Sequence, residues 1–385
     1  MEHLINPNVR EIQVSGIRKF SNRVAAYPNA ISLTLGQPDF PTPEHIKEAA
    51  KRALDANRTV YTHNAGLLEL RKAACDFVAT RYGQQYDPET EVITTTGASE
   101  AIDITLRTIL VPGSEVILPG PVYPGYEPII KQCGAIPVYV DTRETGFKMT
   151  PEAIEAKLTD KTRAVLLPYP SNPTGVVLSR EDLKGIGDLL RDREVFVVSD
   201  EIYSELVYSE EGHRSIVHEP GMRDKTIVIN GLSKSHSMTG WRIGFTFAPA
   251  AISQHILKVH QYNVSCASSV SQYAALEALT HGVDDALAMR VEYRKRLDYV
   301  HDRLDLMGLP CVKPDGAFYL FPSIQHFGIP SLEFCVRLLE QEQLAVVPGD
   351  AFSEYGEGFL RISYAYSMES LKEALDRLQR FVTSL

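Results

Sequence analysis

The sequence lacks the marks of several large classes of protein. Its longest stretch without Asp, Glu, Lys or Arg, residues 259–276, is crowded with Ser, Gln and Asn, so we expect no membrane-spanning segment. The formal charge of −10 argues against nonspecific nucleic-acid binding, which needs clustered Lys and Arg. The five cysteines are scattered and lack CxxC spacing, which argues against a metal site and favours a reducing cytoplasm. We find no internal repeat, low-complexity linker or signal-peptide pattern.

What is present is typical of a globular protein with two domains. A length of 385 residues is long for a single core, and 44% hydrophobic with 23% charged residues is an ordinary globular composition. Short apolar runs alternate with helical or turn-rich stretches, at residues 91–96, 115–118, 137–140, 163–167, 195–198, 226–230 and 244–248. This alternation predicts an α/β fold with a mostly parallel seven-stranded sheet covered on both faces, in a large domain of residues 46–288.

The C-terminal part has a different pattern. Charged and aliphatic residues at helical spacing predict a long helix over 289–306 that links two domains. Strand-like runs follow at residues 316–321, 344–347 and 359–362. They predict a smaller α+β domain that includes residues 289–385.

One lysine stands in a setting that suggests chemistry. Lys234 lies between Ser233 and Ser235, just beyond a strand-like run, and Arg242 stands eight positions after it. A lysine at a strand end can form a Schiff base with an aldehyde cofactor, while hydroxyls and a guanidinium bind a phosphate on the same cofactor. A Ser-Lys-Ser turn is also an ordinary solvated loop, so this segment alone leaves both interpretations open.

Two other strand ends favour the cofactor site. Asp200 and Tyr203 follow one buried apolar run, and Asn172 follows the run before it. Because ligands of open α/β sheets bind beyond the carboxyl ends of strands, we expect these side chains to meet Lys234 in one crevice. Pyridoxal 5′-phosphate suits this set, since a carboxylate holds its pyridine nitrogen protonated and a phenol and an amide bind its ring oxygen. Taken singly, the three residues can instead serve a turn, a helix N-cap or packing.

With these motifs the chain resembles the fold-type I, class I/II pyridoxal-phosphate aminotransferases of the aspartate aminotransferase superfamily. The likeness runs nearly end to end, and its motifs are Ser171-Asn-Pro-Thr-Gly175, Ser199-Asp-Glu-Ile-Tyr203 and residues 233–244. Residues 230–241 are similar to the bacterial enzymes called aminotransferase A, which are associated with N-acetyl-L,L-diaminopimelate transamination in lysine synthesis. The resemblance implies that residues 1–45 join 289–385 in the smaller domain.

The resemblance also implies the cofactor-binding residues. Lys234, Asp200 and Tyr203 would be catalytic, and Asn172 would bind the cofactor with them. Tyr123 would stack over the pyridine ring, with loop packing as its alternative role, whereas Tyr126 is expected to pack locally. The phosphate would be held by the first turn of a helix, by the residues around the lysine and by a tyrosine from a neighbouring subunit, namely Gly97, Ala98, Ser99, Ser233, Arg242 and Tyr61.

On the substrate side, Arg361 lies within an apolar strand-like run, where burial calls for an anionic partner. The resemblance supplies the α-carboxylate of an amino acid, bound as a bidentate pair, with a structural salt bridge as the alternative. Gly36 and Asn172 would contact the same carboxylate.

At two places the sequence either differs from the family's pattern or leaves the role of a residue open. Gly231 stands where many relatives have a serine, so one hydroxyl for the phosphate is missing. Arg18 and Lys19 belong to a segment that edges the substrate pocket in relatives. Either can bind a side-chain carboxylate, and ordinary surface solvation is the alternative.

These expectations describe a ping-pong aminotransferase that moves an amino group between an L-amino acid and a 2-oxo acid. N-acetyl-L,L-diaminopimelate with glutamate and 2-oxoglutarate is the preferred pair, and aromatic or broad-range amino acids are the alternative. A pyridoxal-phosphate β-lyase acting on cysteine conjugates or cystathionine would use the same residues. A non-enzymatic regulator would normally add a basic DNA-binding segment, which we do not find ahead of the predicted catalytic domain. We expect a cytoplasmic homodimer with shared active sites and no metal, nucleic-acid or membrane partner.

Overall fold

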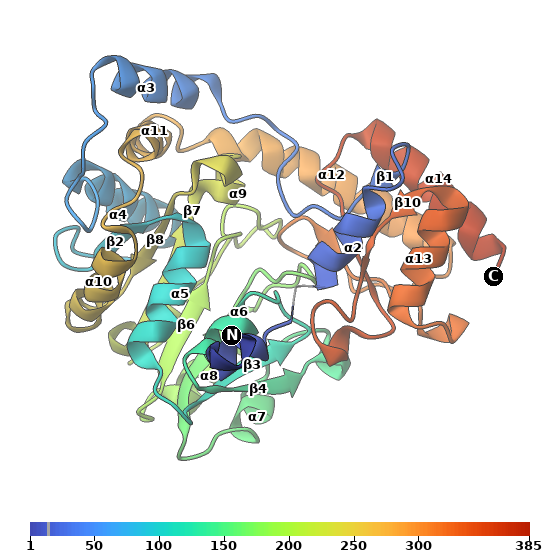
Figure 1. Ribbon diagram of the computed structural model, residues 1–385, viewed down its shortest axis with the longest axis horizontal. Coiled ribbons are helices and arrows are strands. Elements are labelled where there is room, and N and C mark those ends of the chain that lie inside the picture. The colour runs from blue at the N-terminus through green and yellow to red at the C-terminus, as the bar shows by residue number, and fades with distance from the viewer. Residues whose placement is uncertain (14–15) are drawn as a thin grey trace.

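A seven-stranded sheet forms the centre of the fold (Figure 1). The computed structural model describes residues 1–13 and 16–385, and the side chains of Arg18 and Lys19 lie outside what it describes. The sheet order is β2-β8-β7-β6-β5-β3-β4, with bounds Val92–Thr95, Gly244–Phe247, Thr226–Gly231, Phe196–Asp200, Thr162–Leu167, Glu115–Gly120 and Ile136–Asp141. In this sheet β8 runs antiparallel to both of its neighbours, β2 and β7, and the other strand pairs are parallel. The predicted mostly parallel sheet of seven strands is therefore confirmed.

Alternation within the strands explains why both faces of the sheet are covered. In β3, Val116 and Leu118 pack on one face, whereas Ile117 packs on the other. The first face is covered by α5 (Gly97–Ile109), α6 (Tyr126–Gln132) and α10 (Ala250–Val264). The second face is covered by α4 (Leu68–Tyr82), α7 (Pro151–Glu155), α8 (Arg180–Leu190) and α11 (Ser269–Thr280). Strands buried on both faces must be apolar at every position, which is why they stand out in the sequence.

Two small sheets lie at the other end of the molecule. They are β11-β12-β9, which is antiparallel, and β1-β10, which is parallel. Their bounds are Val347–Pro348, Leu360–Ser363, Tyr319–Leu320, Ile31–Ser32 and Leu344–Ala345. The single strand expected over 344–347 is divided between the two sheets, because β10 pairs with β1 whereas β11 pairs with β12. Helices α13 (Ser331–Glu342) and α14 (Met368–Thr383) pack beside these strands.

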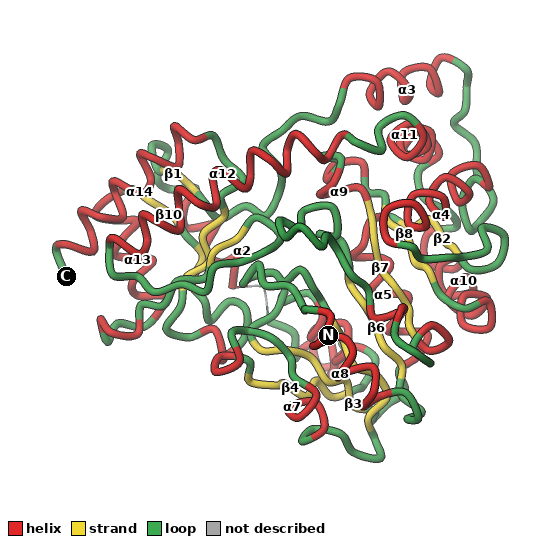
Figure 2. Tube along the Cα trace, turned by 180° about the vertical axis from the view of Figure 1, so that it is seen from behind, coloured by secondary structure: helices red, strands yellow, loops and turns green. Residues whose placement is uncertain are grey.

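The N-terminal segment lies against this C-terminal part. Ile31 of β1 is paired with Leu344 of β10, and Phe20 and Leu33 share a hydrophobic core with Leu344. Figures 1 and 2 both show α2 (Gly16–Val24) and β1 beside β10, far from β2, which is the first strand of the large sheet along the chain. The chain includes a short α1 (Pro7–Arg10) before this segment and α3 (Glu44–Asp55) after it.

The longest helix, α12 (Asp285–Leu306), connects the two ends (Figure 2). It corresponds to the helix expected over 289–306, with an N-terminus four residues earlier. Arg296 on this helix donates two hydrogen bonds of 2.9 Å to Asp39, which ties it to the N-terminal segment. Among the residues that the structure describes, no helix is long and apolar enough to cross a bilayer.

Candidate active site

A cavity of about 350 Å³ opens beyond the carboxyl ends of β2, β5, β6 and β7. Most of the site residues expected from the sequence line it: Gly36, Ala98, Ser99, Tyr123, Asn172, Asp200, Tyr203, Ser233, Lys234, Arg242 and Arg361. Gly97 packs directly behind Arg242 at the same place. Side chains from far-apart segments therefore meet at the strand ends, as the strand pattern indicates.

The lysine lies just beyond the end of strand β7. Lys234 lies in the short helix α9 (Leu232–Ser235), and its amine donates a hydrogen bond of 2.5 Å to the carbonyl oxygen of Gly36. Burial lowers the pKa of Lys234 to about 8, and the charges of Arg361 and Arg242 act in the same direction. An amine with this pKa is neutral in about one molecule in ten at pH 7, far more than at its ordinary pKa, and the neutral form is the nucleophile and base.

Asp200 ends β6 and is buried at the base of the cavity. Its Oδ2 accepts a hydrogen bond of 2.7 Å from the Tyr126 hydroxyl, and its Oδ1 accepts one of 3.1 Å from the Ile202 backbone. Burial raises the pKa of Asp200 to about 6, and the Tyr126 hydrogen bond opposes that rise. The expectation that Tyr126 only packs locally was wrong, because α6 begins at this residue and its hydroxyl reaches the carboxylate.

Arg361 in β12 is 2% exposed, yet the contacts of its guanidinium are with neutral groups. Nη1 donates to Asn172 Oδ1 over 3.1 Å, Nη2 donates to the Thr34 carbonyl oxygen, and Nε has no hydrogen-bond partner among the described residues. The guanidinium also lies over the Tyr319 ring, 4.7 Å from its centroid. A buried cation with an unused donor is costly unless an anion binds it.

Tyr319 is a cavity residue that the sequence did not reveal. Its hydroxyl lies 2.7 Å from the Tyr203 hydroxyl. A Cβ atom at Gly36 would come within 2.3 Å of the Tyr319 hydroxyl, so this position requires glycine. The run that contains Tyr319 was interpreted only as a core strand, and a period-2 pattern does not indicate where a tyrosine hydroxyl points.

The opposite end of the cavity is suited to a phosphate. Gly97 opens α5 with φ of +78°, and a Cβ atom there would come within 2.4 Å of Arg242 Nη2. A Cβ atom at Gly244 would come within 2.6 Å of the Ala98 nitrogen. The first turn of α5, Arg242 and β8 are therefore in close contact, so helix N–H groups and a guanidinium face the same place. At Gly231 a Cβ atom would meet the Ile243 carbonyl oxygen at 3.0 Å, so a serine would be crowded there.

Tyr61 lies outside the cavity of its own chain. Its side chain is 86% exposed, and the neighbouring Val60 and the distant Tyr262 are exposed as well. The expectation that Tyr61 completes a neighbouring subunit's site stays a prediction.

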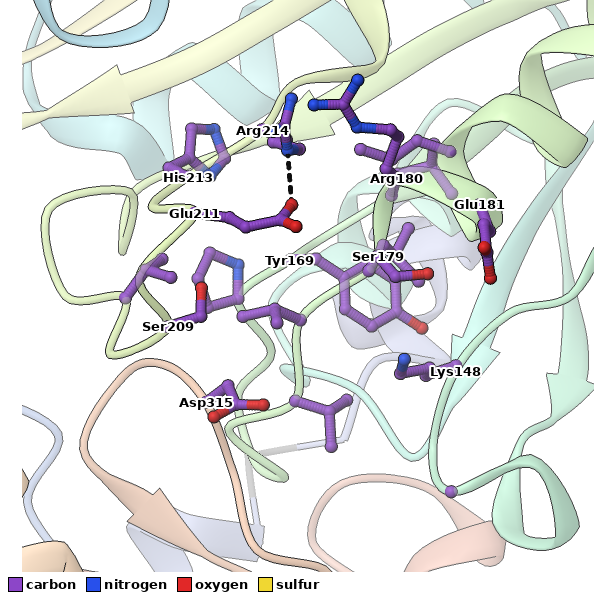
Figure 3. Close-up of a pocket in the computed structure, with 18 of the residues that line it drawn as sticks. Lys148, Tyr169, Ser179, Arg180, Glu181, Ser209, Glu211, His213, Arg214 and Asp315 are labelled. Atoms are coloured by element: carbon purple, nitrogen blue, oxygen red, sulfur yellow. Dashed lines mark hydrogen bonds and ion pairs between the residues drawn. The ribbon is translucent and has the colours of Figure 1, made fainter.

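A larger cavity of about 750 Å³ lies on the α8 side of the sheet (Figure 3). Several charged groups at this cavity are paired within the protein, as Figure 3 shows for Arg214 and Glu211, which are joined at 3.0 Å. Lys148 pairs with Asp182 at 3.0 Å, and His213 contacts the buried Glu201 at 2.8 Å. The smaller cavity is the candidate active site, because it gathers the lysine, the carboxylate and a guanidinium whose Nε has no partner among the described residues.

Comparison with known proteins agrees with this geometry. The family model described as aminotransferase class I and II matches residues 28–378. The chain belongs to this family. It is therefore a transaminase that depends on pyridoxal 5′-phosphate and acts on small amino and 2-oxo acids.

Several individual aminotransferases are similar over nearly their whole length. A probable N-acetyl-LL-diaminopimelate aminotransferase of Bacillus subtilis is 64% identical, covering 99% of this chain and 96% of that protein. Aromatic-amino-acid aminotransferase 2 of Thermococcus litoralis is 40% identical, covering 98% and 97%. The structure of the Thermus thermophilus aspartate aminotransferase with maleate superposes with a TM-score of 0.93 at 34% identity, covering 98% and 99%. The expected α/β fold of this family is thereby confirmed.

The donor set of the cavity fits the cofactor of the family. Lys234 offers an amine of lowered pKa to an aldehyde, and Asp200 offers a carboxylate to a ring nitrogen. Because Gly97 carries no side chain beside Arg242, a phosphate bound there would face both the N–H groups of the helix and the guanidinium. These three groups correspond to the three functional parts of pyridoxal 5′-phosphate.

Proposed function

We propose that this aminotransferase transfers the amino group between N-acetyl-L,L-diaminopimelate and the pair formed by glutamate and 2-oxoglutarate, as a step of lysine biosynthesis. The name and the 64% identity of the Bacillus subtilis relative support this substrate. The observation that carries the reaction class is the buried Arg361, whose Nε lacks a partner among the described residues and which lines the same cavity as the Lys234 amine. An amino acid bound there places its carboxylate on the arginine and its amino group near the lysine.

Lys234 anchors the cofactor and moves the proton. When bound, pyridoxal 5′-phosphate supplies an aldehyde and a ring that accepts electron density. With an amino donor bound, the free amine of Lys234 would act as a general base and take the Cα proton of the donor. Its pKa of about 8 leaves enough neutral amine for this step near neutral pH.

The other residues hold the reacting groups in place. Asp200 would keep the ring nitrogen protonated, Tyr203 and Asn172 would donate to the ring oxygen, and Tyr123 would pack on the ring. Arg361 binds the substrate carboxylate in a bidentate pair, with contacts from Asn172 and Gly36. The phosphate binds to the first turn of α5 and to the segment around the lysine, through Gly97, Ala98, Ser99, Ser233 and Arg242.

Aromatic amino acids are the second candidate donors. Tyr123, Tyr126 and Tyr319 line the cavity, so it offers ring surfaces to an aromatic side chain. The Thermococcus litoralis relative at 40% identity carries the name of an aromatic-amino-acid aminotransferase.

We further infer two domains, residues 46–288 and residues 1–45 with 289–385, and a cytoplasmic homodimer. The pairing of β1 with β10 supports the grouping of the N-terminal segment with the C-terminal part. The five free cysteines suit a reducing compartment. The exposed Val60, Tyr61 and Tyr262 suit an interface at which Tyr61 reaches the neighbouring phosphate site.

Spectra of single half-reactions test the proposed activity. Protein loaded with pyridoxal 5′-phosphate is mixed separately with N-acetyl-L,L-diaminopimelate, glutamate, phenylalanine and cystathionine, with Lys234→Ala as the unreactive control. We expect glutamate and the acetylated donor to convert the cofactor to its pyridoxamine form with release of a 2-oxo acid. Conversion by phenylalanine instead of the acetylated donor would support the aromatic candidate. Accumulation of ammonia and pyruvate from cystathionine without conversion would show a lyase and overturn the proposal.

Subunit mixing tests the shared site. Lys234→Ala and Tyr61→Ala chains are unfolded together, refolded at limiting cofactor and compared with each variant alone. If Tyr61 serves the neighbouring site, half of the dimers are hybrids with one intact site, and activity returns to about a quarter of the wild-type value. No gain over the separate variants would mean that Tyr61 does not act across the interface.

A further inference from the structure

Tyr319 contacts three parts of the site at once. It lies in β9, which pairs with β12 so that Ser363 is opposite Tyr319, and it is fully buried. Its hydroxyl is 2.7 Å from the Tyr203 hydroxyl, and its ring lies 4.7 Å from the Arg361 guanidinium. The same hydroxyl occupies the space beside Gly36 that a side chain would need.

The number of protons on these hydroxyls fixes the direction of their hydrogen bonds. A phenol has one proton to donate and lone pairs to accept with. If Tyr203 donates its proton to the ring oxygen of the cofactor, the bond between the two tyrosines must be donated by Tyr319. We propose that Tyr319 is a positioning residue that links the carboxylate held by Arg361 to the hydrogen bond that Tyr203 makes with the cofactor, an inference that rests on the proposed function.

The sign of this link follows from charge. With Arg361 unpaired, the nearby cation favours electron withdrawal from Tyr319, which makes Tyr319 a stronger donor to Tyr203. A substrate carboxylate neutralises that cation, so Tyr319 and then Tyr203 become weaker donors. A weaker donor at the ring oxygen disfavours its anionic form, which raises the pKa of the linkage between Lys234 and the cofactor. Carboxylate binding thereby makes this linkage more cationic and more open to attack by an amine.

The experiment measures the pKa of the lysine–cofactor linkage from the visible spectrum of the loaded enzyme, with and without maleate, a dicarboxylate that has no amino group to transfer. The variant is Tyr319→Phe. The control is Tyr364→Phe, another fully buried tyrosine, whose hydroxyl bonds the Ala317 carbonyl oxygen instead. The charged and titratable groups that face the tyrosine pair, Lys234, Asp200, Arg361 and Tyr123, are unchanged in both variants.

We expect Tyr319→Phe to raise the linkage pKa of the free enzyme by roughly 0.5 to 1 unit, the size of one neutral hydrogen bond. The further rise on adding maleate should be smaller than in wild type, because the route through Tyr319 is gone. Tyr364→Phe should leave both values within about 0.2 unit of wild type. Wild-type values for Tyr319→Phe, both free and with maleate, would overturn the proposal.

A second background separates a direct link from a general disturbance of packing. In Tyr203→Phe the acceptor is missing, so adding Tyr319→Phe should change the linkage pKa by less than about 0.2 unit. An undiminished effect in that background would mean that Tyr319 acts through packing. If wild-type protein forms no visible band with the cofactor, the proposed function fails. If it forms the band but Tyr319→Phe changes nothing, only this inference fails.

Discussion

The hydroxyl of Tyr126 donates a hydrogen bond of 2.7 Å to Oδ2 of Asp200, and both side chains are buried. The only other hydrogen bond given to this carboxylate among the described residues comes from the Ile202 backbone at 3.1 Å. Two donors from different parts of the chain, α6 and the turn after β6, therefore fix the plane of the carboxylate. Its orientation toward the cavity depends on few contacts, and loss of one should have a measurable effect.

Tyr126→Phe is expected to weaken cofactor binding roughly tenfold, because a hydrogen bond to a charged group contributes about 1.5 kcal/mol. Equilibrium titration of the cofactor-free protein with pyridoxal 5′-phosphate measures this. Tyr139→Phe is the matched control, since it removes a similar bond of 2.6 Å to Glu127 outside the cavity. Equal affinities of the two variants would show that Tyr126 does not serve the cofactor site.

Lys234→Ala should bind cofactor without forming a linkage that borohydride reduces, and its turnover should fall at least about a thousandfold. The variant loses both the covalent anchor and the base for the Cα proton. Mass spectrometry after reduction and steady-state rates check the two effects. Lys258→Ala, at an exposed position of α10, is the control and should behave as wild type. A rate near wild type for Lys234→Ala would contradict its assignment as anchor and base.

Arg361→Lys keeps the charge but loses the fork of donors that matches a carboxylate. We expect kcat/KM to fall roughly a hundredfold or more for every amino donor, since all donors share the α-carboxylate. Arg303→Lys, which alters contacts to Asp376 and Gln379 away from the cavity, is the control. A loss confined to one donor would place Arg361 at a side-chain subsite instead.

Asp200 should make the cofactor-free protein less stable as the pH rises. Its pKa is about 6 in the folded protein against 3.8 for the ordinary group, so the folded state binds more protons between these values. Stability therefore falls from about pH 4 to pH 6 and stays low above that range. Asp200→Asn should exceed wild type in free energy of unfolding by roughly 1 to 3 kcal/mol at pH 7, with little difference at pH 4.

Urea unfolding of the cofactor-free proteins at pH 4 to 8 measures this difference. Asp298→Asn is the control, and its change in free energy of unfolding should have the opposite sign. Lys313 and Arg294 hold the pKa of Asp298 below its usual value. That variant should be less stable than wild type at pH 7. A pH-independent gap between Asp200→Asn and wild type would show that the carboxylate does not titrate in this range.

The sequence was informative where a functional group directly follows a buried strand. Lys234 and Asn172 follow β7 and β5, and Asp200 is the last residue of β6. The uninterrupted apolar runs of a two-sided parallel sheet mark those strands plainly. Tyr126 and Tyr319 were not recognised, because each acts through a hydroxyl whose partner is far away in sequence. Tyr319 and Tyr203 are 116 positions apart, and the packing of β9 against the segment that follows β6 brings their hydroxyls together. The division of 344–347 into β10 and β11 likewise depends on partners that local sequence does not name.

Gly231 and Gly244 are directly paired across β7 and β8, so the connection between these strands is closed by hydrogen bonds of the sheet itself. Lys234 and Arg242 both belong to that closed connection, whereas Gly36 and Arg361 come from opposite ends of the chain. The spacing between the lysine and arginine is thus set locally and is insulated from changes in the segments that face the substrate. Substitutions in the segments that face the substrate can therefore change which amino donor is bound without altering how Lys234 and Arg242 hold the cofactor.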